Sequence, residues 1–349
     1  MGTFPQGDGK SKVAPTIIDV SKRAKVSKST VSRYITHKGY VSDSTREAIE
    51  RAIRELGYRP NETARGLQSS RSNIIGGVVT NLTSSYYSQL VSGIQQACRL
   101  AGKGLLLGSG FGYPEEEERA TLDMVDRSCD GLLLNLEFPL SAAARDVIEK
   151  SGIPVILVGS NEGAIAAGSV TLDNMGGAKE AMRVLLQAGH RRIVHLAGIE
   201  AHRDTHARIA GIASALAELG LSLADIAIEY DSFTEEHGYN SVKRLIAQKV
   251  DFTALFAGDD EIAAGAIAAL KESGRAVPED VSVVGFDDSF YARHLAPALT
   301  TVRLPIATVG ELAVEMLLKV IEGATRRSSD IVVPAELIIR NSVTKAKRS

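Results

Sequence analysis

From residue 74 onward, short apolar runs alternate with helical stretches, and this alternation constrains the fold more than any other feature. The seven runs span residues 74–79, 104–108, 131–135, 154–159, 192–198, 254–258 and 281–286. The helical stretches between them span 86–101, 115–127, 141–151, 176–188, 206–219, 235–248 and 261–273. Strands that are apolar on both faces and lead into helices are typical of a parallel α/β sheet. Because the pattern is too long for one compact sheet, we predict two doubly wound α/β subdomains.

Residues 302–318 hold a further strand and helix after the second set of runs. This segment indicates that the chain crosses back between the halves. We therefore divide the body, residues 74–343, into an N-subdomain and a C-subdomain and expect a polar tail at 344–349. The N-subdomain comprises about 74–172 plus 304–332, and the C-subdomain about 173–301 plus 333–343. Ligands of such proteins bind at the carboxyl ends of strands or between domains.

The segment before the body has a helical pattern. Thr16, Ser27 and Ser42 each precede a helical stretch and are candidate N-caps, and Gly57 ends the third stretch. Only Lys25-Val26 separates the first two helices. Two short helices joined by a tight turn, with a third in support, form a helix-turn-helix unit. We therefore predict an all-α helix-turn-helix domain over residues 16–60.

The charge is uneven along the 349 residues, although the net charge is only −2. Residues 1–65 carry 13 Lys and Arg against 7 Asp and Glu, whereas the remainder carries 27 against 35. A basic end on an acidic body indicates contact with a polyanion. No apolar run reaches the roughly 20 residues of a membrane span. Residues 1–15 lack the apolar stretch of a signal peptide and are expected to form a disordered leader, so we predict a cytoplasmic protein without membrane contact.

The second helix carries the sharpest functional signal. Lys28, Ser29, Ser32 and Arg33 face outward near its start, and Val31 faces inward. First-turn residues of this helix enter the major groove in helix-turn-helix proteins, where an arginine can pair with guanine. Serine and threonine hydroxyls, that of Ser42 included, can bind phosphates. The alternative is a small helical adaptor with a solvated polar face.

Residues 61–73 form a candidate hinge helix and linker. Asn61 can cap one or two helical turns, which are too short to be stable alone in water. Leu67, with Ala64 beside it, has nothing local to pack against. One interpretation is a wedge that enters a base step from the minor groove. The other is that this leucine docks on the body.

The body carries no GxGxxG, P-loop, GxSxG or HExxH signature, so we predict that the chain is not an enzyme. The glycines at 108–112 lack the dinucleotide-loop spacing. His190 and His195 have no partner at ligand spacing and are expected to be structural, and we expect no metal site and no cofactor. Cys98 and Cys129 lack zinc or redox spacing and are expected to be buried thiols.

Polar residues at strand ends are the better candidates for a ligand site. They offer the carboxylates, amide and guanidinium that bind a polyhydroxylated ligand, and nearby aromatic residues offer faces for a sugar ring. The candidates are Asn135, Arg208, Asp259 and Asp287, with Tyr86, Tyr87 and Phe233 as the aromatic faces.

Seven motifs together resemble the lactose/galactose repressor family of bacterial transcription regulators, over about Thr16 to Val343. They are TIIDVSKRAKVSKSTVSR, YVSDSTREAIERAIRELGYRPNETARGLQ, CDGLLLN, RIAG, AGDDEIAAGAIAAL, VPEDVSVVGFDD and PALTTVR. Within this family, the N-terminal and hinge sequence is most similar to repressors of galactoside and β-glucoside operons. The resemblance implies a body like the periplasmic sugar-binding proteins, with a sugar-like effector between the subdomains.

The resemblance also implies a role for individual residues. Base-reading or base-proximal positions are Lys28, Ser29, Arg33 and Tyr40. Phosphate-contacting positions are Ser32, Ser42, Thr45, Tyr58 and Asn61, and Thr16 is included in the DNA-contacting set. Ala64 and Leu67 match hinge residues, with Leu67 expected to wedge into a central CpG step opposite its twin in a dimer. Tyr86, Tyr87, Asn135, Arg208, Phe233, Asp259 and Asp287 fall on pocket positions.

Three positions depart from the family pattern. Asp259 stands where many relatives have Asn, Gly159 where a carboxylate occurs, and Leu304 where Gln is common. The effector therefore stays open between a sugar or glycoside and a non-sugar metabolite, such as a nucleoside or a sugar phosphate. The last residues, NSVTKAKRS, carry no leucine heptad, which predicts a homodimer.

Together these features predict a repressor of a sugar-utilisation operon. It binds a pseudo-palindromic double-stranded operator, and we expect the effector to act as an inducer. Two other classes compete. A transporter's solute-binding protein fits 74–343 but leaves 16–67 without a use, and a sugar-modifying enzyme needs a nucleophile, metal set or phosphate loop.

Overall fold

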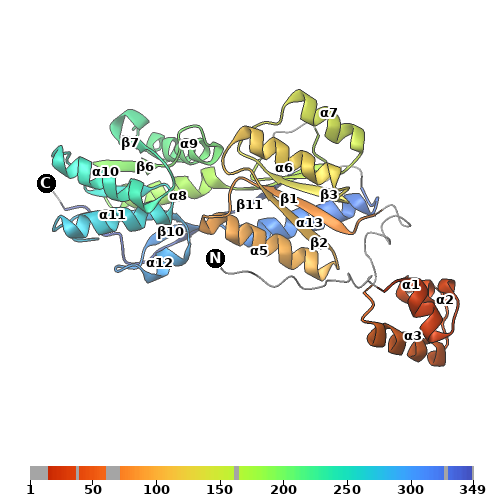
Figure 1. Ribbon diagram of the computed structural model, residues 1–349. Coiled ribbons are helices and arrows are strands. Elements are labelled where there is room, and N and C mark those ends of the chain that lie inside the picture. Colours follow the sequence, from red (N-terminus) through yellow and green to blue (C-terminus); the bar gives the residue numbers. More distant parts are fainter. Residues whose placement is uncertain (1–14, 37–38, 60–70, 161–164, 326–328, 348–349) are drawn as a thin grey trace, which may run out of the picture. The chain divides into compact units, whose positions relative to one another are not determined.

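The computed structural model describes residues 15–36, 39–59, 71–160, 165–325 and 329–347. These residues form two compact units, and the boundary between them in the sequence lies between Ser72 and Asn73 (Figure 1). The predicted leader lies almost wholly outside the described residues. Within these residues, no helix is both long and apolar enough to cross a bilayer.

The first unit contains α1 (Ile17–Ala24), α2 (Lys28–Thr36) and α3 (Asp43–Leu56). The Thr16 hydroxyl accepts from the Asp19 amide and the Asp19 carboxylate bonds back to the Thr16 amide, so the predicted N-cap at Thr16 is confirmed and forms a capping box with Asp19. Lys25 ends α1 with a left-handed φ of 57°. The turn to α2 is therefore as short as the sequence predicts.

Apolar side chains from all three helices form the core of this unit. Val20, Val31 and Ile49 are fully buried in it. The expectation that the Ser42 side chain caps the third helix was wrong. Its hydroxyl does not reach the α3 backbone and instead donates to the Thr45 hydroxyl at 2.9 Å. Helix α3 begins at Asp43 all the same, because tertiary packing rather than a side-chain cap fixes it.

The second unit contains two six-stranded sheets, each covered by helices on both faces (Figure 1). The first sheet has the order β11-β5-β4-β3-β1-β2, and its recorded pairs are all parallel. Its strands are β1 (Ile74–Val79), β2 (Gly104–Ser109), β3 (Gly131–Asn135), β4 (Val155–Val158), β5 (Gly168–Leu172) and β11 (Ile331–Val333). Its helices are α5 (Ser85–Leu100), α6 (Pro114–Asp126), α7 (Ala142–Ser151) and α13 (Ile306–Ile321).

The second sheet has the matching order β12-β10-β9-β8-β6-β7, in which only the edge strand β12 is antiparallel to its neighbour. Its strands are β6 (Ile193–Ala197), β7 (Ala227–Tyr230), β8 (Ala254–Ala257), β9 (Ser282–Asp287), β10 (Thr300–Arg303) and β12 (Glu336–Ile338). Its helices are α8 (Asn174–Gln187), α9 (Arg203–Ala217), α10 (Glu235–Ala247), α11 (Asp260–Glu272) and the short α12 (Phe290–His294), with a 3-10 turn at Leu223–Asp225.

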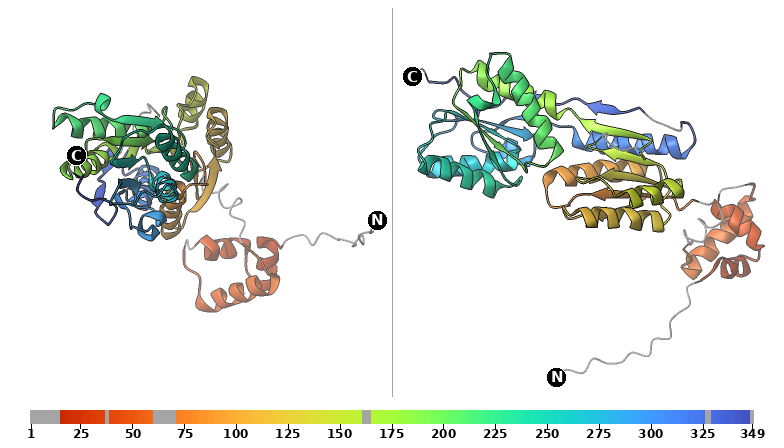
Figure 2. Two further views of the ribbon diagram at one scale, coloured as in Figure 1. Left: turned by 90° about the vertical axis from the view of Figure 1, so that its left-hand side faces the viewer. Right: turned by 90° about the horizontal axis from the view of Figure 1, so that it is seen from above.

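The chain passes between the two sheets three times. It leaves the first sheet after β5, returns after β10 to form α13, and leaves again between β11 and β12. The right-hand view of Figure 2 shows the two lobes of this unit joined by these segments. The predicted fold class, a helix-turn-helix domain plus two doubly wound parallel α/β subdomains, is therefore confirmed.

Candidate functional site

The outward face of α2 is a candidate surface for reading DNA. Lys28, Ser29 and Arg33 are exposed on it, while Val31 is fully buried beneath. The Ser27 hydroxyl accepts from the Thr30 amide at 3.1 Å, which fixes the first turn of the helix. The three polar side chains thus project from the first two turns of α2, where base contacts in a groove can be made.

The other residues predicted to contact DNA differ in exposure. Tyr40 is 86% exposed, whereas Ser32, Ser42 and Thr45 are half-buried. Tyr58, also half-buried, packs against the helical core. The Thr16 hydroxyl is engaged in the capping box of α1. Asn61, Ala64 and Leu67 lie outside the residues that the structure describes.

A cavity of about 430 Å³ lies in the second unit, at the carboxyl ends of strands from both sheets. Six of the seven predicted ligand-binding residues line it: Tyr86, Tyr87, Arg208, Phe233, Asp259 and Asp287. Asn135 instead lines an adjoining cavity of about 30 Å³, where its side-chain amide donates to the Val158 carbonyl at 2.9 Å. The two cavities share Tyr86, Tyr87, Glu137 and Asp204 in their walls.

Arg208 is the central group of the larger cavity and is only 4% exposed. Its Nε donates to Asn174 Oδ1 at 2.9 Å, one terminal nitrogen donates to the Gly258 carbonyl, and the other lies 3.4 Å from Asp287 Oδ1. The guanidinium carbon also lies 4.1 Å from the centre of the Phe286 ring. A guanidinium has five N–H groups, so two remain for a ligand.

Aromatic rings form the apolar walls of the cavity. Tyr86 and Tyr87 meet edge to face with their ring centres 5.1 Å apart. The Phe233 ring lies so close to Gly198 that a Cβ at that position would overlap it. The glycine at the end of β6 therefore lets this ring lie across the strand end, where it can cover an apolar ligand face.

Two buried aspartates occupy the C-terminal ends of β8 and β9. Asp259 follows β8 and caps α11, with Oδ1 accepting from the Ile262 amide at 2.7 Å. Burial, and next the charge of Asp287, raise the pKa of Asp259 well above its usual range. Burial also raises the pKa of Asp287, although the charge of Arg208 opposes this shift. Hydrogen-bond donors on a ligand would therefore stabilise the ionised form of both carboxylates.

Several lining residues escaped the sequence analysis. They include Asn81, Glu137, His202, Asp204, Asp260, Glu261 and Ser289. Asp204 could have been identified from the sequence, because it lies four residues before Arg208 and therefore on the same face of α9. Glu137 lies two residues beyond the end of β3, and its carboxylate is 3.6 Å from His202 Nδ1. Burial, and next the charge of Asp204, raise the pKa of Glu137 to about 7.

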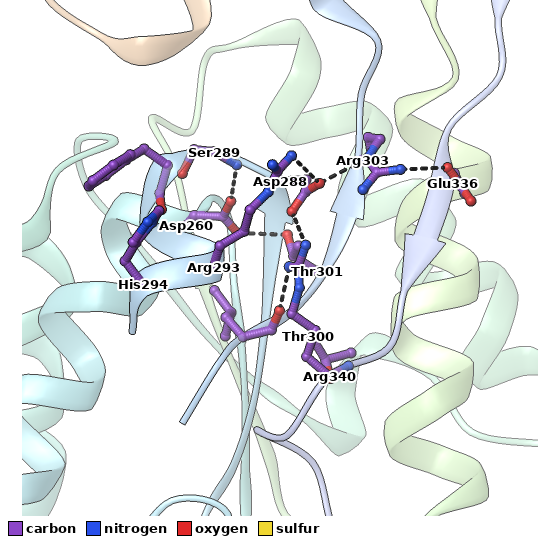
Figure 3. A network of polar contacts seen from close by, with 12 residues as sticks. Asp260, Asp288, Ser289, Arg293, His294, Thr300, Thr301, Arg303, Glu336 and Arg340 are labelled. Atoms are coloured by element: carbon purple, nitrogen blue, oxygen red, sulfur yellow. Dashed lines mark hydrogen bonds and ion pairs between the residues drawn. The ribbon is translucent and has the colours of Figure 1, made fainter. Parts of the chain in front are cut away.

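Asp288 anchors the backbone beside this cavity. Its side chain is 1% exposed and forms ion pairs with Arg340, with Arg303 at 2.8 Å and with Arg293 at 3.6 Å (Figure 3). Arg303 ends β10 and also contacts Glu336 of β12 at 3.2 Å. The network therefore joins the end of β9 to the segments that precede and follow the two C-terminal crossings between the sheets.

The residues with predicted structural roles are buried away from the cavity. His190 bonds to the hydroxyls of Thr253 and Ser282, each at 3.0 Å, and His195 bonds to the Phe256 carbonyl at 2.8 Å. Cys98 and Cys129 are free and buried. Of the departures from the family pattern, Leu304 is 3% exposed in the core, and Gly159 lines the smaller cavity with a φ of 76°.

Known proteins are similar to this chain in sequence and architecture. Residues 16–61 match the bacterial regulatory proteins of the lacI family, and residues 182–343 match a periplasmic binding protein-like domain. The HTH-type transcriptional repressor PurR of Erwinia tasmaniensis is 36% identical over 332 residues, covering 94% of this chain and 96% of that protein.

Two solved structures are similar along nearly the whole chain. The Lac repressor dimer bound to operator and the anti-inducer ONPF has a TM-score of 0.85 at 26% identity, covering 95% of this chain and 100% of that one. The transcriptional regulator CelR-cellobiose complex has a TM-score of 0.70 at 31% identity, covering 94% and 99%. The chain therefore belongs to the lacI family of bacterial regulatory proteins and is a ligand-responsive, DNA-binding transcription regulator.

Proposed function

We propose that this protein is a dimeric repressor whose operator affinity changes when a small polyhydroxylated effector binds the 430 Å³ cavity. The observation that carries the effector site is the buried Arg208, held between Asn174 and Asp287 with two N–H groups left over. A fixed guanidinium beside carboxylates and aromatic walls suits a ligand with many hydroxyls and an apolar face. The chain is proposed to act in the cytoplasm, without catalysis.

The position of the cavity suggests how binding is transmitted. Tyr86 on α5 and Arg208 on α9 belong to different subdomains, so one ligand contacts both. A ligand that bridges two subdomains favours their closed arrangement if it binds that arrangement more tightly. Couplings of this kind are typically about 1–3 kcal/mol. We infer that closure lowers operator affinity, so that the effector induces.

The dimer proposal rests on one observation. The Lac repressor structure, with which this chain shares its fold, is a dimer on its operator. Two copies related by a two-fold axis would present two α2 helices to a pseudo-palindromic site. In each copy, the hinge at 61–73 is proposed to connect the helix-turn-helix unit to the unit that binds the effector.

The proposed function is tested by measuring ligand binding and operator binding on the full-length protein. Neutral mono- and disaccharides, amino sugars, sugar phosphates and nucleosides are screened by thermal unfolding, because a ligand of the native state raises its stability. Each stabilising compound is then added to an operator titration. A compound that raises the unfolding temperature and changes operator affinity supports the proposal. If none stabilises the protein, the polyol-binding assignment is wrong.

Arg33→Ala should weaken specific operator binding by about 1–3 kcal/mol and relax the preference at one base pair of each half-site. The reason is that an arginine at this exposed position can donate two hydrogen bonds to guanine, and alanine can donate none. Base preference is measured by selection from randomised half-sites. Arg54→Ala, which removes an exposed arginine from α3 outside the predicted contact set, is the control. An unchanged preference in the Arg33 variant would exclude the base-reading role.

A further inference from the structure

The effector cavity contains many more carboxylates than cations. Its lining holds Glu137, Asp204, Asp259, Asp260, Glu261 and Asp287. Among the described lining residues, Arg208 is the only lysine or arginine. Three of its five N–H groups are already donated to Asn174, Gly258 and Asp287. The cavity therefore has little positive charge to offer a ligand and an excess of acidic side chains.

The carboxylates are not equally available to a ligand. Asp260 accepts from the Thr301 hydroxyl and the Ser289 amide, both at 2.6 Å, so its role is to hold the wall of the cavity. Asp204 accepts from the Asn174 amide at 3.1 Å. Asp259 has one oxygen occupied by the Ile262 amide, and no donor among the described residues contacts the other. This second oxygen belongs to a side chain that is 8% exposed and lines the cavity.

Burial and mutual repulsion act on these acids together. Burial first, and the charge of Asp287 second, raise the pKa of Asp259. On the other side of the cavity, burial and next the charge of Asp204 raise the pKa of Glu137 to about 7. Like charges in a desolvated site disfavour each other's ionisation, and a cation placed between them reverses this effect. An anionic ligand would add to the repulsion.

We propose that the effector carries a cationic amine among its hydroxyl groups, as an amino sugar does, and that Asp259 binds the ammonium. This inference rests on the proposed function, in which the cavity holds the effector. An ionised carboxylate only accepts hydrogen bonds and an ammonium only donates them, so the free oxygen of Asp259 matches this group. The two remaining N–H groups of Arg208 then serve hydroxyl oxygens. Phosphorylated effectors are disfavoured because Arg208 is the only lysine or arginine among the described residues that line the larger cavity.

The test compares matched ligands on the full-length wild-type protein by isothermal titration. The probes are glucose, glucosamine and glucose 6-phosphate, and the corresponding galactose, mannose and ribose compounds. We expect an amino member to bind about tenfold or more tightly than its neutral counterpart, since a charge-assisted hydrogen bond is roughly twice as strong as a neutral one. The phosphorylated members should bind more weakly than both.

Asp259→Asn isolates the charge. Asparagine caps a helix as well as aspartate does, so the start of α11 is retained while the negative charge is removed. The preference for the amino member over the neutral one should fall to about twofold or less. Asp123→Asn, on the exposed face of α6 and outside the cavity, should keep the wild-type preference.

Each outcome decides the proposal. Tighter binding of an amino member that is lost in Asp259→Asn supports it. Tightest binding of a neutral or phosphorylated member overturns the charge assignment but leaves the effector cavity intact. Binding of no member overturns the proposal of an amino-sugar effector, whereas the polyol-binding function is decided by the wider screen that includes disaccharides and nucleosides.

Discussion

Replacing Arg208 by alanine should abolish the response of operator binding to effector, while the affinity for operator without effector stays near the wild-type value. The guanidinium is 4% exposed and donates to three acceptors in the wall of the cavity. Its removal leaves Asp287 as a buried carboxylate without its cation, and breaking such a pair costs about 3–5 kcal/mol. If the free energy of effector binding is reduced by this amount, the effector concentration needed for a half-maximal response rises more than about a hundredfold.

The measurement is an operator titration repeated at increasing effector concentration. Arg183→Ala is the matched control, because this arginine on α8 pairs with Glu218 at the surface, away from the cavity. Thermal unfolding of both variants separates loss of the site from loss of the fold. Arg208→Lys adds a second comparison, since lysine keeps the charge but carries its donors on a single nitrogen of a flexible stem and cannot reproduce the rigid planar fork of the guanidinium. A wild-type response in Arg208→Ala would refute the pocket assignment.

Six of the seven strands that the apolar runs predict are buried along nearly all of their length, and the edge strand β2 is the exception. All seven apolar runs form strands whose ends lie within one residue of the prediction, and strands such as Val155–Val158 are buried on every residue. Uniform burial leaves an unambiguous apolar signature. The strands that the sequence analysis did not identify are β5, β7, β11 and β12. The β5 strand contains Ser169 and Thr171, and β11 and β12 are three-residue edge strands that tertiary pairing places.

The cavity was predictable where a residue's place in the fold follows from its place in a strand. Asp259 and Asp287 end apolar runs, so they lie at the carboxyl edge of the sheet and face the cavity. Asn135 also ends a strand, but its amide turns to the Val158 carbonyl of the neighbouring strand. Glu137 was missed because it lies in a loop after β3. Its approach to the cavity depends on how the two subdomains meet, which no local pattern specifies.

Asp288→Ala should destabilise the protein by about 1.5–3 kcal/mol, as the loss of hydrogen bonds to a charged group does, and should weaken effector binding as well. The carboxylate is 1% exposed and has three arginine partners, which would lose their common anion. The backbone adds a reason for the second effect. Asp287 and Asp288 have φ values of 98° and 52°, both in the left-handed region. Such strain persists only where the surroundings hold it, and here the network in Figure 3 holds it. Without the network, Asp287 should lose its fixed position near Arg208.

The stability effect should depend on pH in a defined direction. Burial alone would raise the pKa of Asp288, but hydrogen bonds from Arg340 and Arg303 outweigh it and the pKa is lowered. A group whose pKa is lowered by folding contributes stability above its unfolded pKa of about 3.9, and the contribution is lost as pH falls through the folded value. The difference between wild type and Asp288→Asn, measured by urea unfolding, should therefore be full at pH 7 and shrink below about pH 4.

A matched surface pair provides the reference for this measurement. Asp280 pairs with Lys347 at 2.9 Å, and their side chains are 40% and 73% exposed. Asp280→Asn should change the free energy of unfolding by no more than about 1 kcal/mol, as exposed pairs do. If Asp288→Asn lowers the free energy of unfolding at pH 7 by no more than Asp280→Asn does, the ion pairs between Asp288 and the arginines contribute little to stability. Its burial would then reflect packing alone, and the expected loss of effector affinity would have no physical basis.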